Sequence, residues 1–252
     1  TKTDLNAVNP TAPVDDWRLV WSDEFDGATI DAKKWSHEVN CDGGGNQERQ
    51  CYTDAPDNSY VSDGTLKIVA KLNDGAEGND DDFTSARMTT QNKGDFTYGR
   101  VEMRAKLPEG QGAWPAFWMM PTDSVYGGWP KCGEIDIMEQ LFEDHLMVQS
   151  AVHVQGRYGD HPALKQLNVS DVTENFHVYG MIWDEEKIDF TVDGNVFFTY
   201  NPEDRSEDFW PFNKDQFLLL NVAVGGSLGG EVSPEFEQDQ MEVDYVRVYQ
   251  KN

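Results

Sequence analysis

The sequence contains little positive charge. Only 20 of its 252 residues are Lys or Arg, against 46 Asp or Glu, and the formal net charge is -26. Such a charge repels nucleic acids and anionic membranes, which argues against both as partners and favours a neutral or cationic one. We interpret the carboxylates as a solubilising surface spread over the chain and assign no site to them.

Long apolar runs are absent too. No stretch approaches the roughly 20 apolar residues of a membrane-spanning helix, and the first residues contain no hydrophobic signal segment. We therefore expect residues 1–14 to be a tether or linker, or the start of a mature chain whose signal has been removed. Residues 15–252 are expected to form one domain of a secreted or cell-surface protein, which we expect to be a monomer.

Cysteine is also scarce, since three residues allow at most one disulfide and one remaining thiol. Cys41 and Cys51 flank the glycine-rich run Gly43–Asn46 and could close it as a covalent loop; the alternative is three free thiols. No CxxC or Cys/His spacing indicates zinc. The glycine run lacks the Gly-Lys-Ser/Thr of a P-loop, so we interpret it as a loop whose backbone can approach a ligand closely.

What the sequence does contain, from Trp17 onward, is a series of short apolar or alternating runs separated by Gly, Asp, Asn and Pro. No sustained helical periodicity is present. The pattern predicts strands at residues 17–21, 65–71, 98–107, 114–120, 134–139, 148–154, 177–183, 188–192, 196–200, 217–224 and 242–250. Strands of this number and spacing predict an all-β fold of two antiparallel sheets packed face to face.

One stretch places three carboxylates within six residues, with apolar residues between them: Glu134, Asp136 and Glu139. Side chains alternate along a strand, so Glu134 and Asp136 share one face, whereas the odd spacing of Glu139 directs it into the core. A buried unpaired carboxylate is costly, so we predict that one extra residue near Ile137 and Met138 forms a β-bulge and returns Glu139 to the first face.

Two glutamates on one face and one bulge apart suit a retaining glycosidase, in which the nucleophile and the acid/base lie only roughly 5–5.5 Å apart. Glu134 and Glu139 fit these roles. Their mutual repulsion favours protonation of one of them, which an acid catalyst requires, and Asp136 is placed to tune the nucleophile. The alternative is a solvated face of an edge strand that carries three acids without a catalytic role.

The run Glu-Ile-Asp-Ile-Met-Glu resembles the signature of glycoside hydrolase family 16 in its β-bulge form, as in bacterial laminarinases. Similar segments follow in the family's order at residues 21–26, 43–46, 85–87, 110–118, 128–130 and 243–249. The resemblance implies a β-jelly roll with an open, concave substrate cleft. It also implies retaining, endo-acting hydrolysis of a β-1,3-glucan polysaccharide, with no cofactor for catalysis.

By this resemblance, Glu134 matches the nucleophile, Asp136 its helper and Glu139 the acid/base. The positions that match sugar-binding residues of the family are Asn46, Arg87, Trp114, Trp118, Trp129 and His153. Flat aromatic rings suit the apolar faces of sugars, and polar side chains suit their hydroxyls. Taken one at a time, the same residues are also compatible with core tryptophans, a turn Asn, a surface ion pair and a half-buried His.

The resemblance further implies a structural calcium ion on the convex side, held by the backbone carbonyls of Glu24 and Gly64 and the side chain of Asp244. Oxygen ligands of this kind suit a hard cation. Two segments depart from the family pattern, Gln47–Gln50 and Arg157–Asn168, and leave the fine specificity open. The same fold and mechanism can act on mixed-linkage β-1,3-1,4-glucan, and a less favoured alternative is a glucan-binding protein without activity.

Overall fold

The computed structural model describes residues 16–73, 82–141, 144–159 and 161–252, so the expected tether at residues 1–14 lies outside the described part. Within these ranges the helical segments are limited to one 3-10 turn, η1 (Gly43–Gly45), and the short α1 (Gly226–Gly229). No helix of this part of the chain is both long and apolar enough to cross a membrane. The expected all-β class is confirmed.

The strands in chain order are β1 (Trp17–Asp23), β2 (Ser36–Glu38), β3 (Gln50–Tyr52), β4 (Ser59–Ser62), β5 (Thr65–Leu72), β6 (Phe83–Ser85), β7 (Arg87–Thr89), β8 (Asp95–Phe96), β9 (Gly99–Lys106), β10 (Ala113–Pro121), β11 (Glu134–Gln140), β12 (Met147–His153), β13 (Ala163–Asn168), β14 (His177–Trp183), β15 (Ile188–Val192), β16 (Asn195–Tyr200), β17 (Gln216–Val224) and β18 (Gln238–Lys251).

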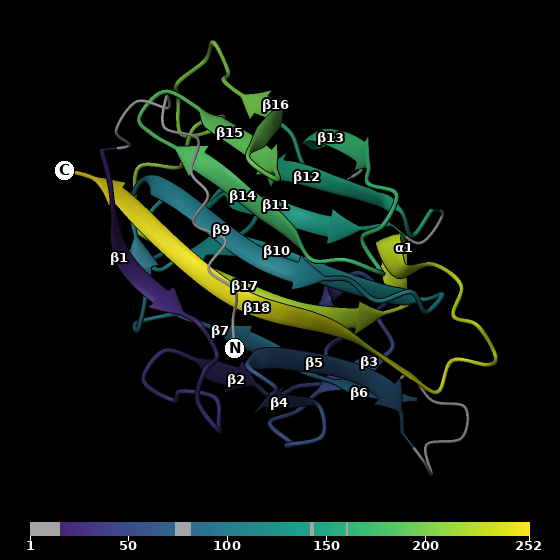
Figure 1. Ribbon diagram of the computed structural model, residues 1–252. Helices are drawn as coiled ribbons and strands as arrows, with labels where there is room; N and C mark the ends of the chain where they lie inside the picture. The colour runs from purple at the N-terminus through teal and green to yellow at the C-terminus, as the bar shows by residue number, and fades with distance from the viewer. Residues whose placement is uncertain (1–15, 74–81, 142–143, 160) are drawn as a thin grey trace.

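These strands form two sheets that lie one behind the other, with β18 running along the nearer one (Figure 1). Sheet A has the order β16-β15-β14-β9-β18-β5-β6-β3, with β1 also paired to β18 and β4 to β5. Sheet B has the order β13-β12-β11-β10-β17-β7-β2, with β8 paired to β17. The two antiparallel sheets expected from the sequence are thus present, with one parallel pair, β3 and β6, at the edge of sheet A.

The core lies between the sheets and follows the predicted alternation. On β9, the side chains of Val101, Met103 and Ala105 are buried, while Arg100 and Arg104 point outward. Strand β17 lies in the middle of sheet B and is buried along all nine residues. Because each fully buried large apolar side chain contributes roughly 1.5–3 kcal/mol, this continuous core holds the two sheets as a rigid support for residues on their outer faces.

The predicted bulge is present in β11. Opposite β12, Asp136 pairs with Ala151 and Glu139 with Gln149, so β11 contains one residue more than β12 over this interval. The side chains of Ile137 and Met138 are both buried, at 2% and 1% exposure. Two successive side chains therefore point into the core, where a regular strand would direct only one. As a result, the carboxylate of Glu139 lies on the outer face of the sheet.

Cys41 and Cys51 form the disulfide that was predicted, in preference to three free thiols. Cys132 is a buried free thiol. The enclosed loop turns tightly at Gly44, which has φ of 57°. A Cβ at Gly44 would lie 2.2 Å from the carboxylate of Glu48, so glycine alone lets this carboxylate pack against the turn.

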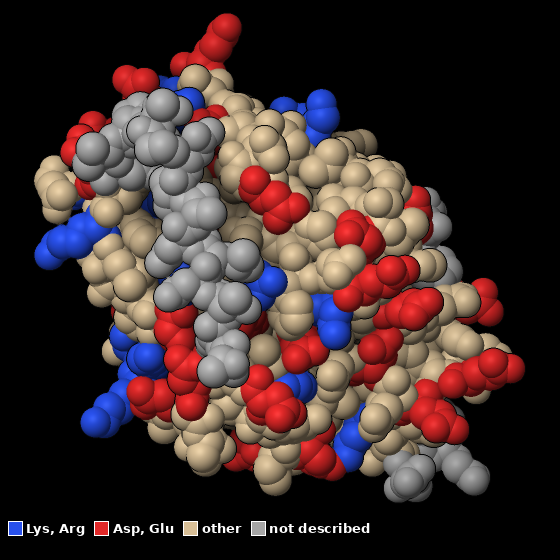
Figure 2. Space-filling view, in the orientation of Figure 1, with Lys and Arg blue, Asp and Glu red and all other residues tan. Residues whose placement is uncertain are grey.

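Acidic side chains are spread over much of the face seen in Figure 2, with basic side chains between them. Several of the basic groups form ion pairs on sheet A, among them Arg104 with Asp244 and Arg247 with Glu24. On this face the distribution agrees with the interpretation of the carboxylates as a solubilising surface.

Candidate active site

The three carboxylates of β11 lie on the outer face of sheet B. Directly paired residues of antiparallel strands share a face, and β11 pairs with β10 on one side and β12 on the other. The partners across these pairs are Trp118 for Asp136, His153 for Glu134 and Gln149 for Glu139. The register of three adjacent strands therefore gathers acids, an indole, an imidazole and an amide on one surface.

Glu134 lies at the start of β11 and is partly exposed. The indole N–H of Trp129 donates to its Oε2, and Asp136 is a further hydrogen-bond partner. Burial, followed by the charge of Asp136, raises the pKa of Glu134 to about 8, while His153 and the Trp129 donor act in the opposite direction. This glutamate is thus poised between its ionised and protonated forms near neutral pH.

Asp136 is the most deeply buried of the three, with 3% exposure. Burial, with a further contribution from Glu139, raises its pKa well above the usual range. His153 Nε2 lies 3.3 Å from Asp136 Oδ2, at ion-pair distance but without the alignment of a hydrogen bond. The hydrogen bond with Glu134 lowers the pKa of Asp136 and raises that of Glu134, so the two carboxyl groups share a proton.

Glu139 follows the bulge and accepts two hydrogen bonds. Trp114 Nε1 donates to its Oε1 over 3.2 Å, and Gln149 Nε2 donates to its Oε2 over 3.0 Å. Burial raises the pKa of Glu139, and the charge of Glu134 raises it further, whereas the Gln149 donor lowers it. The three carboxyl groups raise one another's pKa values through their charges, so the cluster can present an ionised and a protonated carboxyl at neutral pH.

The three expected aromatic residues have different environments. Trp129 follows β10 and precedes a cis peptide bond to Pro130; its side chain is 50% exposed. Its ring lies 6.1 Å from the His153 ring and 5.7 Å from the Tyr158 ring, between centroids. Trp114 is only 7% exposed, so its main observable role is the hydrogen bond to Glu139.

Trp118 is held from two sides. Its indole N–H donates to Asn221 Oδ1 over 2.7 Å, and the Arg87 guanidinium lies over its ring, 4.6 Å from the centroid. Arg87 in turn has its Nε 3.1 Å from a carboxylate oxygen of Glu38. The expected substrate-binding residues Arg87 and Trp118 are therefore in direct contact, although they come from β7 and β10.

Asn46 is linked to the same surface through a polar network. Its Nδ2 donates to Glu48 Oε1 over 3.1 Å, and the Tyr52 hydroxyl donates to Glu48 Oε2 over 3.4 Å. Asn221 Nδ2 donates to the Tyr52 oxygen over 3.0 Å, which connects the loop to the residue that holds Trp118. Glu48 and Asn221 are both nearly buried, so this network is a fixed part of the site.

The sequence reasoning missed four members of this surface: Glu48, Tyr52, Gln149 and Asn221. Two of them gave a signal: Asn221 is a polar residue inside the apolar run 217–224, and Glu48 lies in the segment Gln47–Gln50, which departs from the family pattern. Gln149 reaches the site through the pairing of β12 with β11, whereas Glu48 and Tyr52 reach it through hydrogen bonds to Asn46 and Asn221.

The expected calcium residues lie on sheet A, apart from this surface. Asp23 pairs with Val246 and Leu66 with Val243, which places Glu24 and Gly64 beside Asp244 on neighbouring strands. Asp244 Oδ2 accepts a hydrogen bond from Arg104 over 2.7 Å. In the described part of the chain no three acidic, His or Cys side chains converge as a metal site; the expected set uses two carbonyls and one carboxylate.

Comparison with known proteins agrees with this geometry. The family model for glycosyl hydrolases family 16 matches residues 46–247. A beta-glucanase of Rhodothermus marinus is 42% identical over 248 residues, which cover 92% of this chain and 85% of the relative. A glucan endo-1,3-beta-glucosidase of Cryptopygus antarcticus is 38% identical over 257 residues, covering 94% of this chain and 93% of the relative.

Among solved structures, the laminarinase from Rhodothermus marinus superposes with a TM-score of 0.88 at 40% identity, covering 93% of this chain and 97% of the other. The match of fold, of sequence and of the family model extends over most of the described strands. The chain belongs to glycosyl hydrolases family 16.

Proposed function

We propose that this protein hydrolyses β-1,3-glucan internally and with retention of configuration, with Glu134 as nucleophile and Glu139 as acid/base. The observation that carries the proposal is the bulge of β11, because it brings both glutamates to one face, close enough for Glu134 to raise the pKa of Glu139. The identity to a glucan endo-1,3-beta-glucosidase and to a laminarinase over more than nine-tenths of this chain supports the choice of polymer.

The proposed reaction proceeds by double displacement. The ionised Glu134 attacks the anomeric carbon while the protonated Glu139 donates its proton to the departing glycosidic oxygen, which leaves a glycosyl ester on Glu134. Glu139, now ionised, removes a proton from water, and the resulting attack on the anomeric carbon releases Glu134. The donors on each carboxylate, Trp129 and Gln149, fix their orientation through both steps.

Asp136 has a supporting role in this proposal. In the reactive form the proton shared by the two carboxyl groups is proposed to lie on Asp136, so that its O–H stabilises the ionised nucleophile. His153 Nε2 lies 3.3 Å from Asp136 Oδ2, on the side of that carboxyl. Sugar rings are proposed to pack on Trp118 and Trp129, with Arg87 and Asn46 as hydrogen-bond partners for hydroxyls.

The test is the release of reducing ends from laminarin, with the anomeric configuration of the first product followed by NMR. We expect rapid fragmentation into oligosaccharides and initial β-anomers, and no turnover by Glu134→Ser, which retains oligosaccharide binding. A folded wild-type protein that releases nothing from laminarin would refute the proposal. Lichenan and a galactan in the same assay identify a preference for mixed-linkage glucan or for another polymer.

We also propose an extracellular location and a structural calcium ion. The Cys41–Cys51 disulfide supports the first, because such bonds persist in oxidising compartments. The neighbouring positions of Glu24, Gly64 and Asp244 support the second; the ion would add stability and no chemistry. A monomer is proposed as well, to be checked by light scattering after size-exclusion chromatography.

A further inference from the structure

A hollow apart from the active site lies at the edge of the sandwich, where β13 of sheet B contacts β16 of sheet A. It encloses about 350 Å³, within the roughly 300–1,000 Å³ typical of ligand pockets. Ala163, in its wall, pairs with Val152, a core residue of β12. Paired residues share a face, so this wall lies on the inner side of sheet B, opposite the face that carries Glu134 and Glu139.

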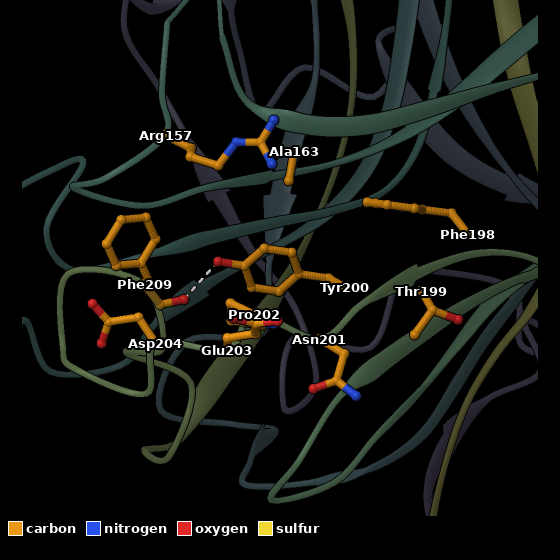
Figure 3. Close-up of a pocket in the computed structure, with 10 residues that line it drawn as sticks. All are labelled: Arg157, Ala163, Phe198, Thr199, Tyr200, Asn201, Pro202, Glu203, Asp204 and Phe209. Atoms are coloured by element: carbon orange, nitrogen blue, oxygen red, sulfur yellow. Dashed lines mark hydrogen bonds between the residues drawn. The ribbon is translucent and has the colours of Figure 1, made fainter.

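Aromatic side chains line the cavity. Figure 3 shows the rings of Phe198, Tyr200 and Phe209 around it, with the Tyr200 hydroxyl directed to the Phe209 carbonyl. This hydrogen bond is 2.6 Å long, so the phenol oxygen is satisfied and the ring is fixed in place. Rings held in this way offer apolar surface to a ligand without a large loss of side-chain freedom.

Polar side chains complete the lining and can form further hydrogen bonds with a ligand. The Arg157 guanidinium extends across the cavity near Ala163 (Figure 3), and among the described residues it makes no hydrogen bond or ion pair. The amide oxygen of Asn201 accepts from Arg205, which leaves its NH2 group as a donor. Glu203 adds an exposed carboxylate acceptor at the rim.

The charges of this lining select the class of ligand. One guanidinium stands against two carboxylates, those of Glu203 and Asp204, so the cavity is a poor site for phosphate or another anion. The Arg157 guanidinium equally disfavours a polyamine. Spare donors and acceptors beside fixed aromatic rings suit a neutral molecule with an apolar face and many hydroxyls, which is the chemistry of a glucosyl unit.

Residues 154–157 connect the end of β12, which carries His153, to the lining of this cavity. Val154 and Arg157 exchange two backbone hydrogen bonds of 2.9 and 2.8 Å, and Gly156 N donates to Asp208 O over 2.8 Å. The Phe209 ring occupies the space where a Cβ of Gly156 would lie. The next residue, Tyr158, contacts Trp129, the hydrogen-bond partner of Glu134.

We propose that this cavity is a second binding site for β-glucan, which holds one or two glucosyl units of a polymer chain at the edge of the sandwich, next to the segment that follows His153. The proposal rests on the proposed function for the identity of the polymer. A polysaccharide held at both sites gains affinity because the second contact is intramolecular, whereas a short oligosaccharide fills each site separately. The cavity therefore increases retention on polymeric substrate and takes no part in bond cleavage.

The experiment uses the Glu134→Ser chain, in which turnover is blocked, and calorimetric titration with laminarihexaose. We expect two molar equivalents to bind, and one in the combined variant Arg157→Ala, Asn201→Ala. The affinity for laminarin is expected to fall by about tenfold or more in this variant. Both side chains are exposed, so the fold is retained. The control Arg18→Ala removes the same charge from exposed β1 and should still bind two equivalents.

A second variant, Asn201→Trp, fills the cavity instead of removing its polar groups and should also bind one equivalent. Binding of a single equivalent to the parent, or of two equivalents to both cavity variants, would overturn the proposal. Failure of the proposed function has a different signature: the unmodified chain would then release no reducing ends from laminarin. One-site binding in a chain that hydrolyses laminarin therefore refutes the cavity alone.

Discussion

Replacing Gln149 with leucine isolates the electrostatic control of the proposed acid/base. Gln149 is 5% exposed and donates to Glu139 Oε2 over 3.0 Å, which lowers the pKa of that carboxyl. Leucine has a similar volume and no donor, so the ionised form of Glu139 loses its partner while the protonated form is little affected. A hydrogen bond to a charged group contributes about 1.5–3 kcal/mol, and one pKa unit corresponds to about 1.36 kcal/mol.

The pKa of Glu139 should therefore rise by about 1–2 units in Gln149→Leu. The alkaline limb of kcat/KM against pH reports loss of the acid's proton in the free enzyme, so this limb should move to higher pH by about that amount. The assay is laminarin hydrolysis across the pH range. Gln166→Leu is the matched control, because Gln166 contacts Gln149 over 3.4 Å and has no bond to Glu139. An alkaline limb that stays in place or moves downward would refute the assignment of Gln149.

Deleting Met138 makes β11 a regular strand in which Glu134, Asp136 and Glu139 still share one face, because their spacing becomes even. Turnover should therefore persist, while the loss of one buried side chain should lower the free energy of unfolding by about 2–5 kcal/mol; a folded variant without activity would contradict this reading of the bulge. Glu134→Gln should raise the free energy of unfolding by up to about 4 kcal/mol at pH 8 and leave it unchanged at pH 4. The reason is that the pKa of Glu134 is about 8 in the folded protein, so the wild type loses stability as the pH rises above 4.5. Denaturant titrations at both pH values measure the difference. Calcium at saturating concentration should raise the melting temperature by about 5 °C. This increase should be lost in Asp244→Asn and kept in the control Arg104→Gln. Equal increases in both variants would rule out the proposed ligands.

Much of the fold follows from local pattern. The alternation of residues 98–107 predicts β9, and the Asp193-Gly194 pair predicts the hairpin between β15 and β16. The bulge was also predictable, because a carboxylate at Glu139 in strict alternation would have been buried without a partner. These inferences succeed because side-chain direction is fixed by the backbone of each strand alone.

The rest depends on contacts between distant segments. Asn46 reaches the active site only through Glu48, Tyr52 and Asn221, and the last two are 169 residues apart in sequence. The parallel pairing of β3 with β6 and the cavity between β13 and β16 likewise arise where elements meet in space. The periodicity of a strand predicts the face on which a residue lies. It does not predict which residue of the next strand is paired with it, so the register between strands is seen only in the structure.

The position of β18 has a consequence for how the protein is made. This strand pairs with β1, β5 and β9, and the hydrogen bond from Thr65 to Glu242 joins residues 177 positions apart. The other strands of sheet A are all synthesised earlier. Until β18 leaves the ribosome, β5 and β9 have open edges and no common neighbour, so the nascent chain consists of two unjoined half-sheets. Pairing of β18 therefore joins the two half-sheets late in synthesis, and a chain truncated before residue 238 exposes unpaired strand edges that favour aggregation.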